Sequence, residues 1–159
     1  MDVRIRPHAL AGAVTPPPSK SMAHRLLLAA ALADGVSTVK NVALSQDIEA
    51  TLRCMAALGA KWEQTDEGTL RVTGIGGKEK SFPELPRFDC GESGSTLRFL
   101  IPIALAVAGG GMFTGRGRLM ERPQSVYEAL YREQGLRFEQ SAAGLTVEGA
   151  LTPGEYRLA

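Results

Sequence analysis

A cluster of cations and hydroxyls lies directly before an apolar stretch near the start of the chain. Lys20, Ser21 and Arg25 run into residues 26–33, which are all leucine or alanine. The first amides of a helix are unpaired and its dipole is positive there, so a helix start with added cations attracts phosphates and carboxylates. Ser21 and Arg25 are four residues apart and share one helix face. A serine N-cap followed by two solvated cations is the alternative, and the apolar stretch argues against it.

Residues 91–98 repeat this arrangement with glycines. Gly91 and Gly94 allow the backbone to approach a ligand closely and to present its amides. Arg98 lies four residues after Gly94, the same spacing as in the first cluster. A flexible turn before a helix is the alternative, and the recurrence of the pattern favours a second anion site.

A third candidate anion site is Arg122, which stands directly before Pro123. Proline suits the first position of a helix over residues 123–134, which would place Arg122 at the positive end of that helix dipole. A cation kept in this unfavourable place suggests an anionic ligand. An exposed arginine is equally consistent, because water and salt screen the repulsion.

The histidines and cysteines follow no metal-ligand or nucleophile pattern, and we predict no metal. His8 and His24 have no evident metal partners, and we expect His24 to cap or pack. Cys54 falls on the apolar face of its helix and is expected in the core. Cys90 adjoins the glycine loop, where thiol reagents could reach it, although nothing marks it as a nucleophile.

The bulk composition is that of an ordinary globular protein. The chain has 159 residues, 44% hydrophobic and 22% charged, with a net charge of +1. This balance gives no bulk attraction to nucleic acid or to an acidic membrane. The apolar runs are too short to span a bilayer, and no secretory leader is visible. Two cysteines without metal spacing fit a reduced, cytoplasmic protein.

The two anion segments belong to an internal repeat. When Ser19 is aligned with Ser93, Gly35 meets Gly109. The first copy predicts helices over 20–33 and 46–58 and strands over 37–42, 61–64 and 70–73. The second predicts helices over 95–108 and 123–134 and strands over 111–114, 137–140 and 145–148. The class is therefore α/β (α+β), with helices packed on sheets.

Several details follow from this repeat. The first helix of each copy is apolar all round after its arginine, so we expect it to be buried on all sides, with the sheets outside. Ser45 is expected to cap the second helix, and Asp47 to occupy its first turn or to hold Lys20. In the fourth helix, Val126, Ala129 and Leu130 predict the buried face. Pro102 should kink the third helix.

Three motifs together resemble 5-enolpyruvylshikimate-3-phosphate synthase in a bacterial form. They occupy residues 18–25, 89–99 and 120–123, in the family's order and spacing. The resemblance implies repeated βαβαββ units in an inside-out α/β barrel-like domain, with buried helices and outer sheets. The implied divisions are a leading strand over 1–14 that would pair with a missing second domain, a first unit over 15–75, a connecting loop over 76–88, and a second unit over 89–159, truncated before a third.

The family transfers an enolpyruvyl group from phosphoenolpyruvate to the 5-hydroxyl of shikimate 3-phosphate and releases phosphate. This is a step of the shikimate pathway to aromatic amino acids, and the resemblance implies no cofactor. By position, Lys20, Gly94 and Arg122 would bind phosphoenolpyruvate, where glyphosate would compete. Ser21 and Arg25 would bind shikimate 3-phosphate. Lys20 alone is a candidate for a catalytic role, and the full-length protein is expected to be a monomer.

Supporting roles fall to three further residues. Arg98 would support the glycine loop, and Asp47 would hold Lys20. Glu92 stands where many members have Asn, which adds a carboxylate near an anion site, and its role stays open; Phe99 stands where many have Pro. The family's proton-transfer groups lie outside this sequence. We therefore expect the purified 159-residue chain to show no enolpyruvyl transfer, and detectable transfer would contradict this.

Two alternative functions are compatible with parts of this pattern. UDP-N-acetylglucosamine enolpyruvyl transferase shares the fold, but it expects a different start to the first helix and a reactive cysteine in another loop. The other alternative is a non-catalytic anion-binding module. Selective binding of shikimate 3-phosphate over inorganic phosphate distinguishes the enzyme from such a module.

Overall fold

The computed structural model describes residues 3–4, 6–7, 9, 11–76 and 81–156. The first half of the described chain contains α1 (Lys20–Leu32), β1 (Val36–Val39), α2 (Gln46–Ala57), β2 (Lys61–Asp66) and β3 (Thr69–Thr73). The second half contains β4 (Arg87–Asp89), α3 (Gly94–Ala108), β5 (Gly110–Thr114), α4 (Ser125–Glu133), β6 (Arg137–Ser141) and β7 (Gly144–Glu148). The α+β class is confirmed.

The strand pairing of the two sheets agrees with an internal repeat. The first sheet has the order β1-β3-β2, and all of its pairs are antiparallel. The second sheet has the order β4-β5-β7-β6, in which β5, β7 and β6 correspond to β1, β3 and β2. β4 pairs with β5 in parallel. The second half therefore reads βαβαββ.

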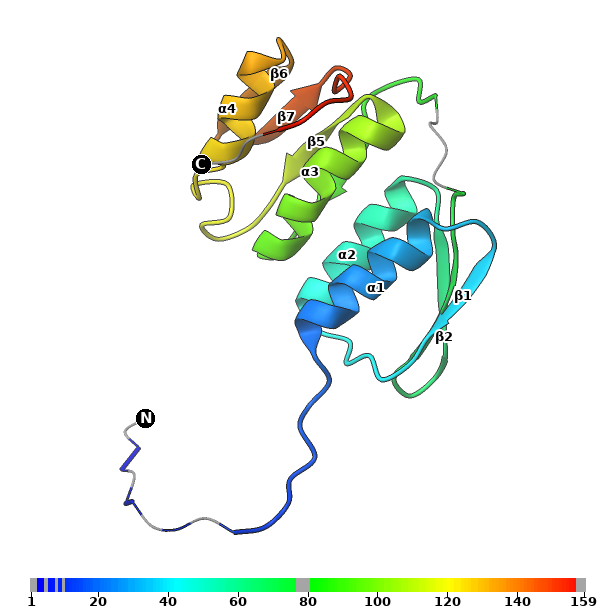
Figure 1. Cartoon of the computed structure of the whole chain (residues 1–159), viewed down its shortest axis with the longest axis vertical. Helices are drawn as coiled ribbons and strands as arrows, with labels where there is room; N and C mark the ends of the chain where they lie inside the picture. Colours follow the sequence, from blue (N-terminus) through cyan, green and yellow to red (C-terminus); the bar gives the residue numbers. More distant parts are fainter. Residues whose placement is uncertain (1–2, 5, 8, 10, 77–80, 157–159) are drawn as a thin grey trace.

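The first half lacks a counterpart of β4 among the described residues. The described residues before Lys20 contain no strand, and Figure 1 shows them running away from the helices. Ile5 lies outside the described residues. The pairing of residues 1–14 with another domain stays a prediction.

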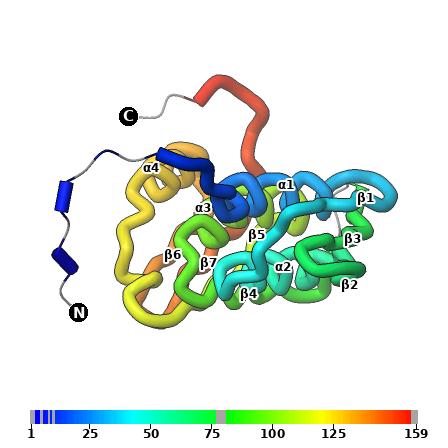
Figure 2. The backbone as a smooth tube through the Cα atoms, turned by 90° about the horizontal axis from the view of Figure 1, so that it is seen from below, coloured from blue at the N-terminus to red at the C-terminus, as the bar shows by residue number. Residues whose placement is uncertain are grey.

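The helices form a layer beside the two sheets. Figure 1 shows α1, α2 and α3 side by side, and α2 contacts both α1 and α3. The first sheet packs against α1 and α2, while α3 and α4 contact the second sheet. Figure 2 shows the same arrangement from below. Leu27, Ile48 and Leu97 bring the three helices into one hydrophobic core.

Two element boundaries differ from those predicted. β4 begins at Arg87, inside the segment predicted as a connecting loop, because Arg87 and Phe88 pair with β5. β1 ends at Val39 and not at Val42, whose amide bonds instead to the carbonyl of Gly68. Local pattern alone does not reveal which neighbouring strand is available, so such ends depend on tertiary pairing.

One face of α1 is open to solvent, so the prediction that this helix is buried on all sides is wrong. Leu27 and Ala31 are 1% exposed, whereas Met22 is 54% and Leu26 46% exposed. α1 packs mainly against α2, β1 and β3, and these elements cover only part of its surface.

Pro102 lies inside α3, which continues through it from Gly94 to Ala108. A proline has no amide hydrogen, so the carbonyl four residues earlier, that of Arg98, loses its helical partner. The hydroxyl of Tyr127 on α4 donates to this carbonyl oxygen at 2.9 Å. The aromatic residue of one helix thus replaces the missing hydrogen bond of another.

Substituting Tyr127 by phenylalanine should lower the free energy of unfolding by roughly 1 kcal/mol, because the carbonyl of Arg98 would lose its donor. Pro102→Ala restores an amide hydrogen and should make the loss smaller. A double-mutant cycle measured by urea unfolding tests this coupling. Additive effects of the two substitutions would contradict this role for Tyr127.

The fourth helix starts later than predicted, and the prediction of its buried face is only partly confirmed. Its N-cap is Gln124, so Pro123 precedes the helix and is not its first residue. Leu130 packs against the core as predicted, but Val126 is 42% exposed and the fully buried residue is Tyr131. The rings of Tyr127, Tyr131 and Phe138 contact one another in turn. Aromatic packing against β6 decides the orientation, because large rings bury more apolar area than Val or Ala.

Candidate anion-binding site

Lys20 stands at the start of α1 and is held by Asp47. Ser19 caps the helix by accepting a hydrogen bond from the amide of Met22. The ammonium of Lys20 lies 2.6 Å from the Asp47 carboxylate, which belongs to the first turn of α2. Half of the Lys20 side chain remains exposed. Asp47 therefore orients the lysine and leaves it accessible to a ligand.

Arg25 joins the start of α1 to α3. Its Nη1 donates to the backbone oxygen of Ser21 at 2.8 Å. Its guanidinium lies 5.1 Å from the ring centre of Phe99, which is a cation–π distance. Ser21 and Arg25 are both exposed. The aromatic residue that departs from the family pattern is thus the one that supports Arg25.

The glycine loop leads into α3. Ser93 caps the helix by accepting from the amide of Thr96 at 3.2 Å. Gly91 has a φ of +57°, which favours glycine over residues with a side chain. Its amide donates to the Asp89 carboxylate at 3.0 Å. The loop therefore turns sharply just before the first residue of α3.

A second loop, residues 115–122, lies against the glycine loop. The amide of Arg116 donates to the carbonyl of Gly91 at 2.7 Å. Arg122 Nη1 would lie 3.2 Å from a Cβ placed on Gly94, so the guanidinium comes directly to the first residue of α3. The carboxylate of Glu92 lies against Gly117. These two loops form the part of the candidate site at the start of α3, beside the start of α1.

Arg122 lies at a different helix start from the one predicted. The sequence placed it at the positive end of α4, but α4 begins only at Ser125. Its side chain instead reaches the N-terminus of α3, where a cation is also disfavoured unless an anion is bound. Its backbone oxygen accepts from Gln140 at 2.9 Å and from Gln124 at 3.3 Å.

Sequence reasoning missed these two glutamines. Gln124 and Gln140 are single amides that belong to no sequence motif. They reach the backbone oxygen of Arg122 because the fold places α4 and β6 beside residues 115–122. Arg98, predicted to support the glycine loop, donates from Nε to Gln124 at 3.4 Å. Its side chain thus contacts the start of α4.

The Asp89 carboxylate interacts with both the glycine loop and residues 115–122. The amide of Gly91 lowers the pKa of Asp89 most, and the positive charges of Arg53 and Arg116 add to this. The Asp89 carboxylate lies 3.5 Å from Arg116 and 3.8 Å from Arg53. The Asp89 carboxylate thus pairs with Arg53 and Arg116, whereas Arg122 lies at the start of α3.

Both cysteines are free and buried, so the prediction that reagents could reach Cys90 is wrong. Cys90 is 0% exposed because β4 carries it into the core beside α2. A hydrogen bond with Cys54 and burial raise the pKa of the Cys90 thiol. Cys54 is buried as predicted, and its thiol donates to the backbone oxygen of Asp89. Neither thiol is placed for nucleophilic chemistry.

His24 is buried, in agreement with a packing role, and its Nδ1 lies 2.8 Å from the hydroxyl of Thr51. His8 lies outside the described residues. No group of three or more His, Cys, Asp or Glu that could hold a metal occurs within the described ranges. In the same part of the chain, no helix is long and apolar enough to cross a membrane.

Protonation of His24 should destabilise the fold. Burial lowers its pKa in the folded chain, partly offset by the charge of Asp47. The unfolded chain therefore binds this proton more readily, and the free energy of unfolding should fall as the pH drops below about 6.5. His24→Gln should flatten the dependence between about pH 7 and 5, measured by urea unfolding. Unchanged slopes would contradict this.

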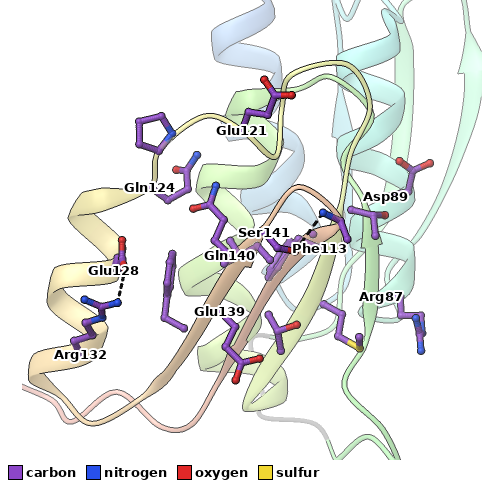
Figure 3. A pocket seen from close by; sticks show the side chains of 18 residues that line it. Arg87, Asp89, Phe113, Glu121, Gln124, Glu128, Arg132, Glu139, Gln140 and Ser141 are labelled. Atoms are coloured by element: carbon purple, nitrogen blue, oxygen red, sulfur yellow. Dashed lines mark hydrogen bonds and ion pairs between the residues drawn. The ribbon is translucent and has the colours of Figure 1, made fainter.

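A separate hollow of about 1040 Å³ lies along the second sheet. Figure 3 shows it between α4 and the sheet, with Gln124, Glu128, Arg132 and Gln140 around it. None of the residues predicted to bind substrate lines it. A smaller hollow of about 270 Å³ borders Arg122, together with Arg118, Glu121 and Pro123.

Comparison with known proteins decides the family. The family model described as EPSP synthase (3-phosphoshikimate 1-carboxyvinyltransferase) matches residues 5–149. The chain belongs to the EPSP synthase family. This range includes the two helix starts and Arg122.

Relatives within the EPSP synthase family are longer than this chain. The 3-phosphoshikimate 1-carboxyvinyltransferase of Clostridium novyi is 43% identical, and the match covers 99% of this chain and 38% of the relative. That of Clostridioides difficile is 40% identical over 98% of this chain and 38% of the relative. The chain thus spans less than two-fifths of these relatives.

A solved structure supports the fold. EPSP synthase from Acinetobacter baumannii superposes with a TM-score of 0.73 and 24% identity. The match covers 87% of this chain and 32% of that one. This likeness confirms the fold of the described elements.

Proposed function

We propose that this chain supplies part of the substrate-binding half of an enolpyruvyl transferase. The reaction joins phosphoenolpyruvate to the 5-hydroxyl of shikimate 3-phosphate. The hydroxyl adds to C2 of phosphoenolpyruvate as C3 is protonated, and phosphate then leaves the tetrahedral intermediate. Membership of the EPSP synthase family supports this reaction. The reaction as written uses no cofactor.

The observation that carries the proposal is the position of Arg122 at the start of α3. The helix start is already positive, and Arg122 Nη1 lies against Gly94 with no side chain between them. Two positive groups are held together most readily when an anion neutralises both. The phosphate of phosphoenolpyruvate is such an anion.

The second substrate belongs at the start of α1. Ser21 and Arg25 are exposed on one helix face, and Phe99 and the backbone of Ser21 hold the guanidinium. Lys20, oriented by Asp47, contributes a further positive charge at the same helix start. We assign shikimate 3-phosphate to Ser21 and Arg25, and phosphoenolpyruvate to Lys20, Gly94 and Arg122. Holding both substrates together lowers the entropic barrier to their reaction.

A titration tests this assignment. The 159-residue chain, labelled with ¹⁵N, should bind shikimate 3-phosphate more tightly than inorganic phosphate. Arg25→Ala should weaken this binding by roughly tenfold or more, because a charge-assisted hydrogen bond is lost. Arg71→Ala is the matched control, since Arg71 pairs with Glu63 on the first sheet. Equal affinity for both ligands would indicate a generic anion module.

A further inference from the structure

A chain of buried polar side chains connects α1, α2 and α3. His24 Nδ1 lies 2.8 Å from Thr51 Oγ1, and Thr51 Oγ1 lies 2.8 Å from Thr96 Oγ1. Thr96 Oγ1 in turn lies 2.8 Å from Ser93 Oγ. Each of the four residues is at most 2% exposed. Such polar groups are costly inside a core unless they bond to one another.

The chain of hydrogen bonds ends at Ser93, beside the candidate site. Ser93 is the N-cap of α3 and precedes Gly94. The hydroxyls of Thr51 and Thr96 both lie 3.3 Å from the backbone oxygen of Asp47, whose carboxylate holds Lys20. The same few hydrogen bonds therefore connect the starts of all three helices.

The remaining contacts between these helices are mainly apolar. Leu27, Ile48 and Leu97 are completely or almost completely buried in the shared core. Apolar burial has no preferred direction, so it allows one helix to shift along another. Hydrogen bonds have narrow distances and angles and can fix that shift.

The available hydrogens decide which group donates and which accepts along this chain of hydrogen bonds. Each hydroxyl has one hydrogen to donate, and His24 Nε2 is buried with no hydrogen-bond partner among the described residues. A proton on Nε2 would leave a buried donor unpaired, whereas a proton on Nδ1 would be donated to Thr51. Unpaired buried acceptors are tolerated better than unpaired donors. The geometry thus favours the Nδ1–H form of His24.

We propose that His24, Thr51 and Thr96 are positioning residues of the anion site. His24 donates from Nδ1 into a chain of hydrogen bonds that holds the start of α3 in register with the starts of α1 and α2. This inference rests on the proposed function, because register matters only if one ligand pair contacts both helix starts. Small misplacements of binding groups strongly weaken ligand binding and catalysis.

The first test needs no ligand. ¹⁵N NMR of the imidazole, assigned by comparison with His24→Gln, should show protonated Nδ1 and bare Nε2 at neutral pH. Thr51→Val removes the acceptor and should change the tautomer signals. An Nε2–H form in the parent chain would overturn the proposed direction.

The second test separates positioning from stability. Thr96→Val keeps the shape and removes the hydroxyl, whereas Thr96→Ser keeps the hydroxyl. At a temperature where both are folded, Thr96→Val should weaken phosphoenolpyruvate binding by roughly tenfold and Thr96→Ser by no more than about threefold. Thr73→Val, on the exposed side of β3, controls for the substitution type. Equal affinity of folded Thr96→Val and the parent would overturn the positioning role.

The two proposals fail in different ways. If the parent chain binds no phosphoenolpyruvate, the proposed function is contradicted, and the positioning role falls with it. The hydrogen-bond chain itself is then decided by NMR, through the His24 tautomer and through amide exchange at Thr96. If the backbone amide at position 96 exchanged with solvent at the same rate in Thr96→Val as in the parent, the hydrogen-bond chain would be overturned as well.

Discussion

Arg122→Ala is expected to weaken binding of phosphoenolpyruvate by roughly 10- to 100-fold. Its guanidinium lies against Gly94 at the start of α3, where it would form charge-assisted hydrogen bonds with the phosphate. Such bonds contribute about 1.5 to 3 kcal/mol. The helix amides would remain, so some affinity should persist. Isothermal titration calorimetry measures the change.

Arg118→Ala is the matched control for this prediction. Arg118 belongs to the same loop, but its side chain is 86% exposed and pairs with Glu121. Its removal should leave affinity within about twofold of the parent, since exposed ion pairs contribute little. Arg122→Lys should give an intermediate loss, because an ammonium lacks the planar fork of guanidinium. Equal losses for Arg118→Ala and Arg122→Ala would point to bulk charge instead of a site.

Gly74→Ala should destabilise the fold by about 3 kcal/mol or more, near the upper end of overpacking effects. A Cβ on Gly74 would meet the backbone oxygens of Ala30 and Ala33 at the end of α1, the closer of them well inside contact distance. Backbone atoms cannot rotate away as a side chain can. Movement would also break the hydrogen bonds from the amides of Ile75 and Gly76 to the carbonyls of Ala31 and Ala33.

Gly154→Ala tests whether the loss is specific to that contact. A Cβ on Gly154 would have its nearest neighbour at 3.9 Å. The free energy of unfolding of Gly154→Ala should therefore match that of the parent within about 0.5 kcal/mol. Urea unfolding followed by the fluorescence of Trp62 compares both variants. A Gly74→Ala midpoint equal to the parent's would show that the α1–β3 junction relaxes freely.

Local rules predicted the elements that depend on neighbouring residues. α2 begins at Gln46 with Ser45 as its N-cap, as expected from a polar residue before an apolar periodic run. Glu128 and Arg132 form an ion pair at 2.7 Å, because they are one helical turn apart. Such features rest on spacing within one helix, and spacing can be read from the chain.

The cluster at Lys20, Ser21 and Arg25 shows how far the sequence alone reached. The sequence predicted two apolar helices that start with cations and hydroxyls, an internal repeat, and the pairing of Lys20 with Asp47. Only the tertiary structure decided that Arg122 serves the start of α3, that Tyr127 replaces the hydrogen bond missing at Pro102, and that His24 is connected through two threonines to Ser93. These contacts join residues far apart in the chain, and single polar side chains carry no mark of the partner that folding brings to them.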